Sequence, residues 1–436
     1  MNQEPVAHGA GNIVTAARGD VRLFDRGIDY AALAARHGSP LLVLDCNVLR
    51  QQYRALAAAL PGVRLHYAIK ALPEVAAIAT LAEEGAHFDI ASQGEIELLH
   101  QAGVGPRQTI HTHPIKRPRD IVAALRAGVT TFVADNAAEI DKLARFRDRV
   151  ALLLRVSFRS PDARCDLSKK FGCMPEDVHG LLARAAAAGV QVKGLSFHVG
   201  SQSASSAAHV HAIEACAALI RANNLATHNS PAHNLPPNHL PTSESHAGNK
   251  LYVLDIGGGF PVNYDGTTLG IDAFCAPIRA ALRQLPDSVT VFAEPGRFLA
   301  APAMTCITSV IGKAERGGKP WYFLDDGVYN SFSGQIFDHT TYPLTTLITR
   351  PGRAVQPGEP GGDAMRLSVL AGPTCDSIDI IAEDIMLPEL AIGDLVIAPL
   401  MGAYTSASAT QFNGFARTTI LALHAPVRAS NVVRFG

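Results

Sequence analysis

The sequence lacks any marked excess of charge. Its 38 Lys and Arg residues nearly balance its 39 Asp and Glu residues, which leaves a formal net charge of −1. This balance gives no electrostatic reason to expect nucleic acid or a membrane surface as a partner. No apolar run approaches the roughly 20 residues that span a bilayer. The polar segment Met1–Val14 also lacks the basic-then-apolar pattern of a secretory signal.

Paired cysteines are absent as well. The seven cysteines are scattered, without CxxC spacing, so we expect neither a disulfide framework nor a metal site built on cysteine. A reduced, cytoplasmic setting is the expected location. The apolar fraction of 47% and charged fraction of 18% are ordinary for a globular enzyme, and 436 residues suffice for two domains.

Short apolar segments alternate with Ala-rich helical segments between residues 65 and 296. Segments such as Pro73–Glu84 and Pro175–Ala188 have the apolar spacing of amphipathic helices. Eight strands alternating with helices predict a (β/α)8 barrel, and a doubly wound open sheet is the less favoured alternative. The predicted strands are Leu65–Lys70, His87–Ser92, Thr109–Ile115, Thr130–Asn136, Ala151–Val156, Gly194–Gly200, Leu251–Gly259 and Val289–Gly296.

Beyond residue 300 the pattern changes to short β-rich runs interrupted by Gly and Pro, which predict strands at Ala303–Ile311, Trp321–Leu324, Met365–Leu370, Leu395–Pro399 and Thr418–Ala422. We therefore assign residues 40–300 to the barrel and 301–436 to a C-terminal, mostly antiparallel β domain. The N-terminal segment, residues 1–39, either joins this β domain together with the strand-like Leu41–Asp45 or stays separate from it. Residues 223–249, rich in Pro and Asn, are expected to be a solvated loop inserted in the barrel. The spacing of its histidines matches no metal-ligand pattern; they are His228, His233, His239 and His246.

The reactive groups of a (β/α)8 barrel lie at the C-terminal ends of its strands. In this chain the predicted strand ends carry chemically active side chains and a glycine cluster rather than mostly small residues. They are Lys70, Ser92, His113, Asp135, Arg155, His198, Gly257–Gly259 and Glu294.

Lys70 closes the apolar run His66–Lys70. A lysine in this position commonly extends its amine to solvent, but an amine near a phosphate site can form a Schiff base with an aldehyde cofactor. Two turns are candidate phosphate sites. Gly257–Gly259 allows close approach of backbone amides to an anion, although G-x-G-x-x-G spacing is absent, and Glu294–Arg297 combines a carboxylate, a tight turn and a guanidinium.

These segments, with others in the same order, resemble the ornithine/diaminopimelate/arginine decarboxylase family, whose fold includes alanine racemase. The resemblance runs from about residue 40 to 420 and is closest to the ornithine/lysine decarboxylases. The inserted 223–249 segment departs from the family pattern, and so does the run His111–Ile115, where relatives usually show a different tripeptide before the lysine. The matching segments are His66–Lys70, Phe88–Ser92, Glu95–Glu97, Ser196–Ser201, Leu254–Phe260, Glu294–Arg297, Asp326–Tyr329, Gly372–Asp376, Gly402–Thr405 and Phe412–Phe415.

The resemblance implies a pyridoxal 5′-phosphate enzyme that carries its cofactor on Lys70. It places Glu294 beside the pyridine nitrogen, where a carboxylate favours the protonated ring; an arginine there would favour racemase chemistry. His198 would stack on the ring. The other cofactor-binding residues that the resemblance implies are Asp89, Arg155, Ser201, Gly257, Gly258, Gly259, Gly296, Arg297 and Tyr404.

Cys375 lies in the turn-like Gly-Pro-Thr-Cys-Asp segment. The resemblance implies that it acts as a general acid that reprotonates Cα, which makes it catalytic together with Lys70, His198 and Glu294. It also implies a homodimer with shared active sites, in which Cys375, Asp376 and Tyr404 enter from the second subunit.

The substrate is inferred from few residues. Asp338 and Asp376 match positions where ornithine decarboxylases bind the distal amine, and Phe412 is also assigned to the substrate site. Diaminopimelate decarboxylases usually carry glutamate after the cysteine, so Asp376 favours L-ornithine or L-lysine, with putrescine or cadaverine as product. The alternative to amine binding is that either aspartate has only a structural role and caps a turn.

Three other functions stay open. The chain could decarboxylate meso-diaminopimelate, or an amino-acid conjugate in siderophore assembly, for which the insertion and the unusual tripeptide leave room. A more remote alternative is a non-catalytic homologue that binds a regulatory partner. Such proteins lose the lysine or the phosphate contacts, whereas this chain retains Lys70, His198, Glu294, Cys375 and Tyr404.

Overall fold

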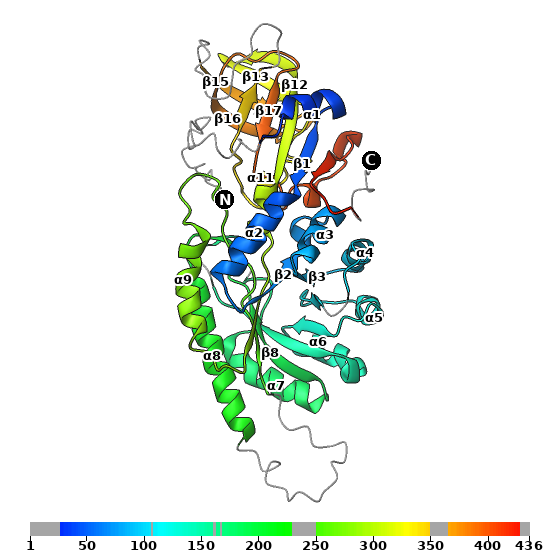
Figure 1. Ribbon diagram of the computed structural model, residues 1–436, viewed down its shortest axis with the longest axis vertical. Coiled ribbons are helices and arrows are strands. Elements are labelled where there is room, and N and C mark those ends of the chain that lie inside the picture. Colours follow the sequence, from blue (N-terminus) through cyan, green and yellow to red (C-terminus); the bar gives the residue numbers. More distant parts are fainter. Residues whose placement is uncertain are drawn as a thin grey trace, which may run out of the picture.

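The computed structural model describes residues 27–105, 108–159, 163–165, 168–228, 250–348 and 365–427. A barrel and a β domain lie end to end along the longest axis of the molecule (Figure 1). No helix within these ranges is long and apolar enough to cross a membrane. The predictions for residues 1–26 and for most of the inserted segment, residues 229–249, lie outside the described residues.

Eight parallel strands close into a barrel, which confirms the predicted (β/α)8 fold. Their order around the barrel follows the sequence, and the last strand pairs with the first. Most strands are shorter than predicted, because the chain leaves the sheet before the apolar run ends. The strands are β2 (Arg64–Ala68), β3 (His87–Ile90), β4 (Thr109–His111), β5 (Thr131–Ala134), β6 (Ala151–Val156), β8 (Gln191–Phe197), β10 (Val253–Asp255) and β11 (Thr290–Ala293).

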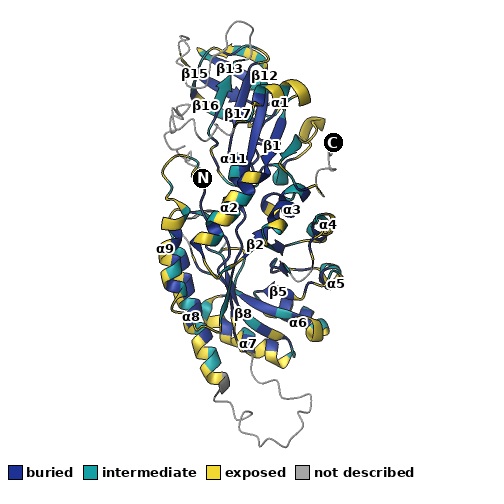
Figure 2. Ribbon diagram, in the orientation of Figure 1, coloured by how far each residue is buried: buried dark blue, intermediate teal, exposed yellow. Residues whose placement is uncertain are grey.

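Helices surround the barrel, and all except Val75–Glu83, in which only Glu83 is exposed, have one face buried and one exposed (Figure 2). This division follows from their amphipathic sequences, since only one apolar face can pack on the strands. The helices are α2 (Cys46–Ala59), α3 (Val75–Glu83), α4 (Gln93–Gln101), α5 (Pro118–Arg126), α6 (Ala137–Leu143), α7 (Val178–Ala187), α8 (Ala207–His228) and α9 (Ile271–Leu282).

The second unit is built on an eight-stranded, mostly antiparallel sheet, as predicted. Among the described strands of this sheet, only β1 with β18 and β13 with β15 pair in parallel. Two of its strands, β14 and β16, were not predicted. The strands are β1 (Leu41–Asp45), β12 (Met304–Arg316), β13 (Lys319–Leu324), β14 (Thr345–Leu347), β15 (Arg366–Ala371), β16 (Ile380–Leu387), β17 (Leu395–Ala398) and β18 (Thr419–Leu423).

The described part of the N-terminal segment packs on this sheet. Leu41 of β1 lies opposite Ile307 in an antiparallel pair, and Tyr30 of α1 (Tyr30–His37) joins the same apolar cluster. The sheet therefore includes β1, and the boundary between the two units falls after Asp45 rather than at residue 40.

The inserted segment begins later than predicted. Residues 223–228 are not loop but the last turns of α8. The side chain of Asn224 explains this, because its amide donates to the carbonyl of Leu251 at 2.8 Å and its oxygen accepts from the Leu251 N–H at 2.9 Å. These two bonds tie the end of α8 to the residues that enter β10.

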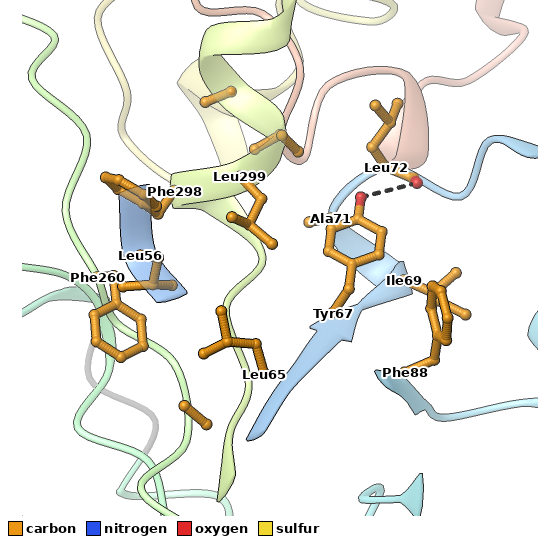
Figure 3. Packing of buried hydrophobic residues seen from close by; sticks show 14 of the residues in the cluster. Leu56, Leu65, Tyr67, Ile69, Ala71, Leu72, Phe88, Phe260, Phe298 and Leu299 are labelled. Atoms are coloured by element: carbon orange, nitrogen blue, oxygen red, sulfur yellow. Dashed lines mark hydrogen bonds between the residues drawn. The ribbon is translucent and has the colours of Figure 1, made fainter. Parts of the chain in front are cut away.

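The sequence predicted that Lys70 is the last residue of β2. Instead, Lys70 lies in the short 3₁₀ turn η2 (Ile69–Ala71), which follows the strand. Ile69 and Ala71 are fully buried, and the Tyr67 hydroxyl donates to the carbonyl of Leu72 at 3.1 Å (Figure 3). Burial of a side chain as large as Ile69 stabilises by about 1.5–3 kcal/mol. Packing therefore fixes the backbone of the turn, while Lys70 is exposed.

Candidate active site

A cavity of about 300 Å³ opens at the C-terminal ends of the barrel strands, beside residues of the β domain. Its volume is that of a small-ligand site. It brings together most of the predicted site residues, which come from eight separate segments of the chain. Those that line it are Lys70, His113, Arg155, His198, Ser201, Gly258, Gly259, Glu294, Gly296, Arg297, Asp338 and Tyr404.

The amine of Lys70 is held by a buried carboxylate. Its Nζ donates to Asp89 Oδ2 at 2.7 Å, and Thr112 donates its hydroxyl to the other oxygen of Asp89. Burial alone would lower the pKa of Lys70, but the charges of Asp89 and Glu294 outweigh it and raise the pKa above its ordinary value. The side chain is still 43% exposed, so the amine is accessible from the cavity.

Glu294 and Asp255 form a buried carboxyl pair at the base of the cavity. Burial raises the pKa of Glu294 well above its usual range, and the charges of Asp255 and Asp89 add to the effect. Burial also raises the pKa of Asp255, to about 6. Two buried carboxyl groups this close cannot both ionise without cost, so the pair retains a proton near neutral pH.

His198 presents a neutral ring to the cavity. Its Nδ1 accepts the N–H of Gly200 at 3.0 Å. Burial lowers its pKa well below the usual value, and the charges of Arg155 and Lys70 lower it further. The glycine at position 258 is required beside this ring, because a Cβ there would lie 3.1 Å from Nε2 and 2.7 Å from the carbonyl oxygen of Glu294.

Arg297 organises the other end of the cavity. Its guanidinium donates to Ser201 Oγ and to the Tyr264 hydroxyl, each at 3.2 Å, and pairs with Asp338. It also lies over the ring of Tyr404, 4.9 Å from the centroid. Guanidinium and hydroxyl donors grouped in this way suit a phosphate group.

A family model described as the pyridoxal binding domain of pyridoxal-dependent decarboxylases matches residues 47–232 and 239–301. The chain belongs to this family. It is therefore a pyridoxal-phosphate-dependent decarboxylase, as the resemblance implied.

Its relatives include decarboxylases of basic amino acids. It is 38% identical to a lysine/ornithine decarboxylase of Selenomonas ruminantium over 89% of this chain and 90% of that protein. A structure of a Vibrio vulnificus lysine/ornithine decarboxylase with putrescine is 48% identical, with a TM-score of 0.78, and the alignment covers 90% of this chain and 97% of that one. A second structure, with cadaverine, is 49% identical, with a TM-score of 0.78 over 90% of this chain and 95% of that one. An arginine decarboxylase of Paramecium bursaria Chlorella virus with agmatine is 30% identical, with a TM-score of 0.78 over 90% and 99% of the two chains.

The residues of this decarboxylase fit pyridoxal phosphate. Lys70 supplies an accessible amine, and the Glu294–Asp255 pair supplies a buried proton for a ring nitrogen. Within the described part of the chain, the amides of Gly258 and Gly259 donate to no protein acceptor. Free amides on a cavity wall are the donors that a phosphate group needs.

The carboxyl pair makes the stability of the decarboxylase without cofactor depend on pH. Because the folded-state pKa of Asp255 is raised to about 6, the unfolded chain releases this proton first, and stability falls as pH rises from about 4 through about 6. Asp255→Asn removes that penalty and retains an oxygen for the N–H of Gly257. We expect the variant to melt at a higher temperature than the parent protein at about pH 8, by a margin that narrows toward about pH 4.

Thermal unfolding followed by circular dichroism at several pH values measures this margin. The exposed Asp287→Asn change is the control and should leave the pH dependence unaltered. A margin that stays constant across the range would show that the carboxyl pair is not the cause.

Tyr404 corrects one expectation. It was predicted to enter from a second subunit, but it lines the cavity of its own chain, and its N–H donates to the carbonyl of Ala71 at 2.9 Å. The reason is that the β domain packs directly on the barrel rim, so this residue of the β domain reaches the turn that carries Lys70.

Five of the predicted catalytic and binding residues do not line the cavity. Asp89 and Gly257 contact residues beside it, since Asp89 accepts from Lys70 and the N–H of Gly257 donates to Asp255. The other three, Cys375, Asp376 and Phe412, lie with Tyr329 in a partly exposed group on the β domain that we name the Cys375 cluster. The Cys375 thiol is exposed, and its N–H donates to Asn413 Oδ1 at 3.0 Å. Asp376 accepts the hydroxyl of Tyr329, whose ring stacks on Phe412 at 4.3 Å. The cluster thus combines a thiol, a carboxylate and an aromatic surface that do not face their own chain's cavity.

Two strand-end residues have local roles instead. Ser92 caps α4 by accepting from Glu95, and Asp135 accepts the N–H of Gly172 at 2.9 Å. Conversely, Thr112, Phe171 and Tyr264 line or support the cavity and were not predicted. They lie in loops that follow the strands, and loop residues have no periodic sequence pattern from which they could be predicted. The signal closest to one of them was the predicted strand-end residue His113, which is next to Thr112.

Proposed function

We propose that this decarboxylase acts on a basic L-amino acid, L-ornithine or L-lysine, and releases CO2 together with putrescine or cadaverine. The observation that carries the chemistry is the Lys70 amine, held 2.7 Å from Asp89 in the same cavity as the proton-retaining Glu294. The relatives named lysine/ornithine decarboxylase, with structures that contain both diamines, support the substrate.

Each cavity residue has a proposed role. Pyridoxal phosphate, when bound, accepts the electrons left at Cα as CO2 leaves. Lys70 would hold the cofactor covalently, Glu294 would keep a proton at the ring nitrogen, and His198 would pack on the ring face. Asp89 and Arg155 orient the reacting end. The residues proposed to hold the phosphate are Ser201, Gly257, Gly258, Gly259, Gly296, Arg297 and Tyr404.

We further propose that the active unit is a homodimer in which the Cys375 cluster of one subunit completes the cavity of the other. A thiol that acts as general acid must reach the substrate, yet Cys375 faces solvent in its own chain. Large apolar side chains in and near the cluster are also exposed: Phe412 of the cluster by 40%, and its neighbours Ile378 by 52% and Phe415 by 43%. Exposed apolar groups that gather in this way mark contact surfaces between proteins.

A cytoplasmic location is part of the same proposal. The six described cysteines whose side chains are placed are free, which is typical of proteins kept in a reducing compartment. The near-zero net charge supports a small-molecule substrate rather than nucleic acid or membrane as the partner.

Asp376 is the proposed partner of the distal amine. The hydroxyl of Tyr329 lowers the pKa of Asp376, which keeps the carboxylate charged at neutral pH and suits an ammonium group. Asp338 lies in the cavity but is already paired with Arg297, so its share in amine binding is secondary. Asp376 also accepts the N–H of Ile378 at 3.2 Å, which is the turn-capping alternative.

CO2 release from ornithine, lysine, diaminopimelate and arginine under one condition tests the substrate. We expect turnover of ornithine and lysine. In Asp376→Asn, KM for both should rise by about tenfold to a hundredfold, the worth of a hydrogen bond to a charged group. A capping role alone would leave KM unchanged, because asparagine can cap the same turn.

Other outcomes select the alternatives. Preference for diaminopimelate would overturn the role of Asp376, and inactivity with all four amino acids would favour a conjugate substrate. Protein that gives no absorbance band after incubation with pyridoxal phosphate would favour the non-catalytic homologue.

A further inference from the structure

His209 is a fully buried histidine that neither the cavity lining nor the family resemblance includes. It lies on α8 with no exposed surface, enclosed by the rings of Phe197, Phe260 and Phe274, whose centroids are 5.5 to 6.5 Å from its own. Its Nε2 lies 3.0 Å from the carbonyl oxygen of Gly258. An imidazole therefore sits in an apolar pocket with one polar contact, directly behind the glycine turn.

The protonation state of His209 follows from its surroundings. Burial lowers its pKa to about 4, so the ring is neutral near pH 7 and carries one N–H. A carbonyl oxygen can only accept, so that N–H is on Nε2 and is donated to Gly258. Nδ1 has no partner among the described residues. A buried polar atom without a partner lowers stability, and an apolar side chain at position 209 would have no such atom. The one interaction that histidine provides here and an apolar residue could not is the hydrogen bond to Gly258.

The three carbonyl groups of the glycine turn are each held by one donor. Gly257 accepts the N–H of Glu294 at 2.8 Å, and Gly259 accepts the N–H of Ser203 at 3.1 Å. The carbonyl of Gly258 is held by His209 alone among the described residues. Glycine backbones rotate easily, and Gly259 has a positive φ of 100°. The orientation of the Gly258–Gly259 peptide therefore depends on the hydrogen bond from His209.

The direction of that contact determines where the next amide points. In a planar trans peptide the carbonyl and the following N–H point in opposite directions. Holding the Gly258 carbonyl toward α8 therefore turns the N–H of Gly259 away from α8, toward the cavity that Gly258 and Gly259 line. This N–H has no acceptor in the described protein and is free for a ligand.

We propose that His209 is a positioning residue that fixes the Gly258–Gly259 peptide with its N–H directed at the phosphate group of the cofactor. The proposal rests on the proposed role of the glycine turn in phosphate binding. It predicts that His209 affects affinity for the phosphate group and not for the pyridoxal ring.

The test compares two ligands on cofactor-free protein, pyridoxal phosphate and pyridoxal, which lacks the phosphate. Affinities are measured from the change in ligand absorbance for the parent protein, His209→Phe and His209→Gln, with the exposed His211→Phe on the same helix as control. We expect His209→Phe to bind pyridoxal phosphate roughly tenfold more weakly, the effect of one hydrogen bond, and pyridoxal unchanged. His209→Gln retains a donor and should recover most of the affinity, and His211→Phe should match the parent.

Each outcome decides between the two proposals. Equal weakening for both ligands, or no weakening, would overturn the role of His209 while the phosphate site stands. A parent protein that binds both ligands equally would overturn the phosphate role of the glycine turn, and the positioning role with it. If His209→Phe does not fold, His209→Met, which has similar volume and no donor, is compared with His209→Gln in the same way.

Discussion

Lys70→Ala is expected to reduce kcat about a thousandfold or more and to remove the absorbance band of covalently bound cofactor. The amine is the nucleophile for the cofactor aldehyde, and no other described lysine lines the cavity. Its loss also leaves the buried carboxylate of Asp89 without its cation. Spectra of purified protein with added pyridoxal phosphate, together with CO2 release, measure the two effects.

Lys193→Ala is the matched control. Lys193 lies near the start of β8, at the opposite end of the barrel strands from the cavity, where its amine donates to Thr131 at 2.6 Å. Its removal should leave the absorbance band and kcat unchanged. A Lys70→Ala protein that keeps the band would show that the cofactor is attached elsewhere or not covalently.

The barrel could be predicted from the sequence because its strands are buried on both faces and separated by amphipathic helices. The ends of the strands could not. Ile69 and Ala71 are as apolar and as buried as the residues of β2, so the pattern cannot distinguish a strand from the packed turn that follows it. In β16, Glu383 and Asp384 interrupt the apolar alternation where the backbone of Asp384 takes a positive φ of 56°, and the strand was missed.

The residues of the active site could likewise be predicted only in part. Strand ends and family motifs bring Lys70, His198 and Glu294 to one cavity, because parallel strands direct their C-terminal ends to one rim. The pairings between side chains could not be predicted. The Arg297–Asp338 ion pair and the bond from His209 to Gly258 depend on the paths of loops and on a helix packed behind them. Sequence spacing contains no information about those paths.

Mixing Lys70→Ala with Cys375→Ala protein is expected to restore activity to about one quarter of the parent level, although each variant alone is inactive or nearly so. Removal of a general acid should lower kcat by about a hundredfold to ten-thousandfold. If the Cys375 cluster completes the cavity of the other subunit, a mixed dimer has one cavity with both lesions and one with neither. Random exchange makes half of the dimers mixed, each with one intact site of two, which gives about a quarter.

The control pairs two lesions from the same cavity. Lys70→Ala mixed with Glu294→Ala should stay inactive, because both residues line the cavity of one chain and each cavity of a mixed dimer keeps one lesion. Subunit exchange is verified by size-exclusion chromatography of differently tagged chains. Recovery in both mixtures would mean that activity returns by some route other than shared cavities. If exchange is verified but the Lys70→Ala and Cys375→Ala mixture regains no activity, the exposed Cys375 thiol does not belong to the partner's cavity.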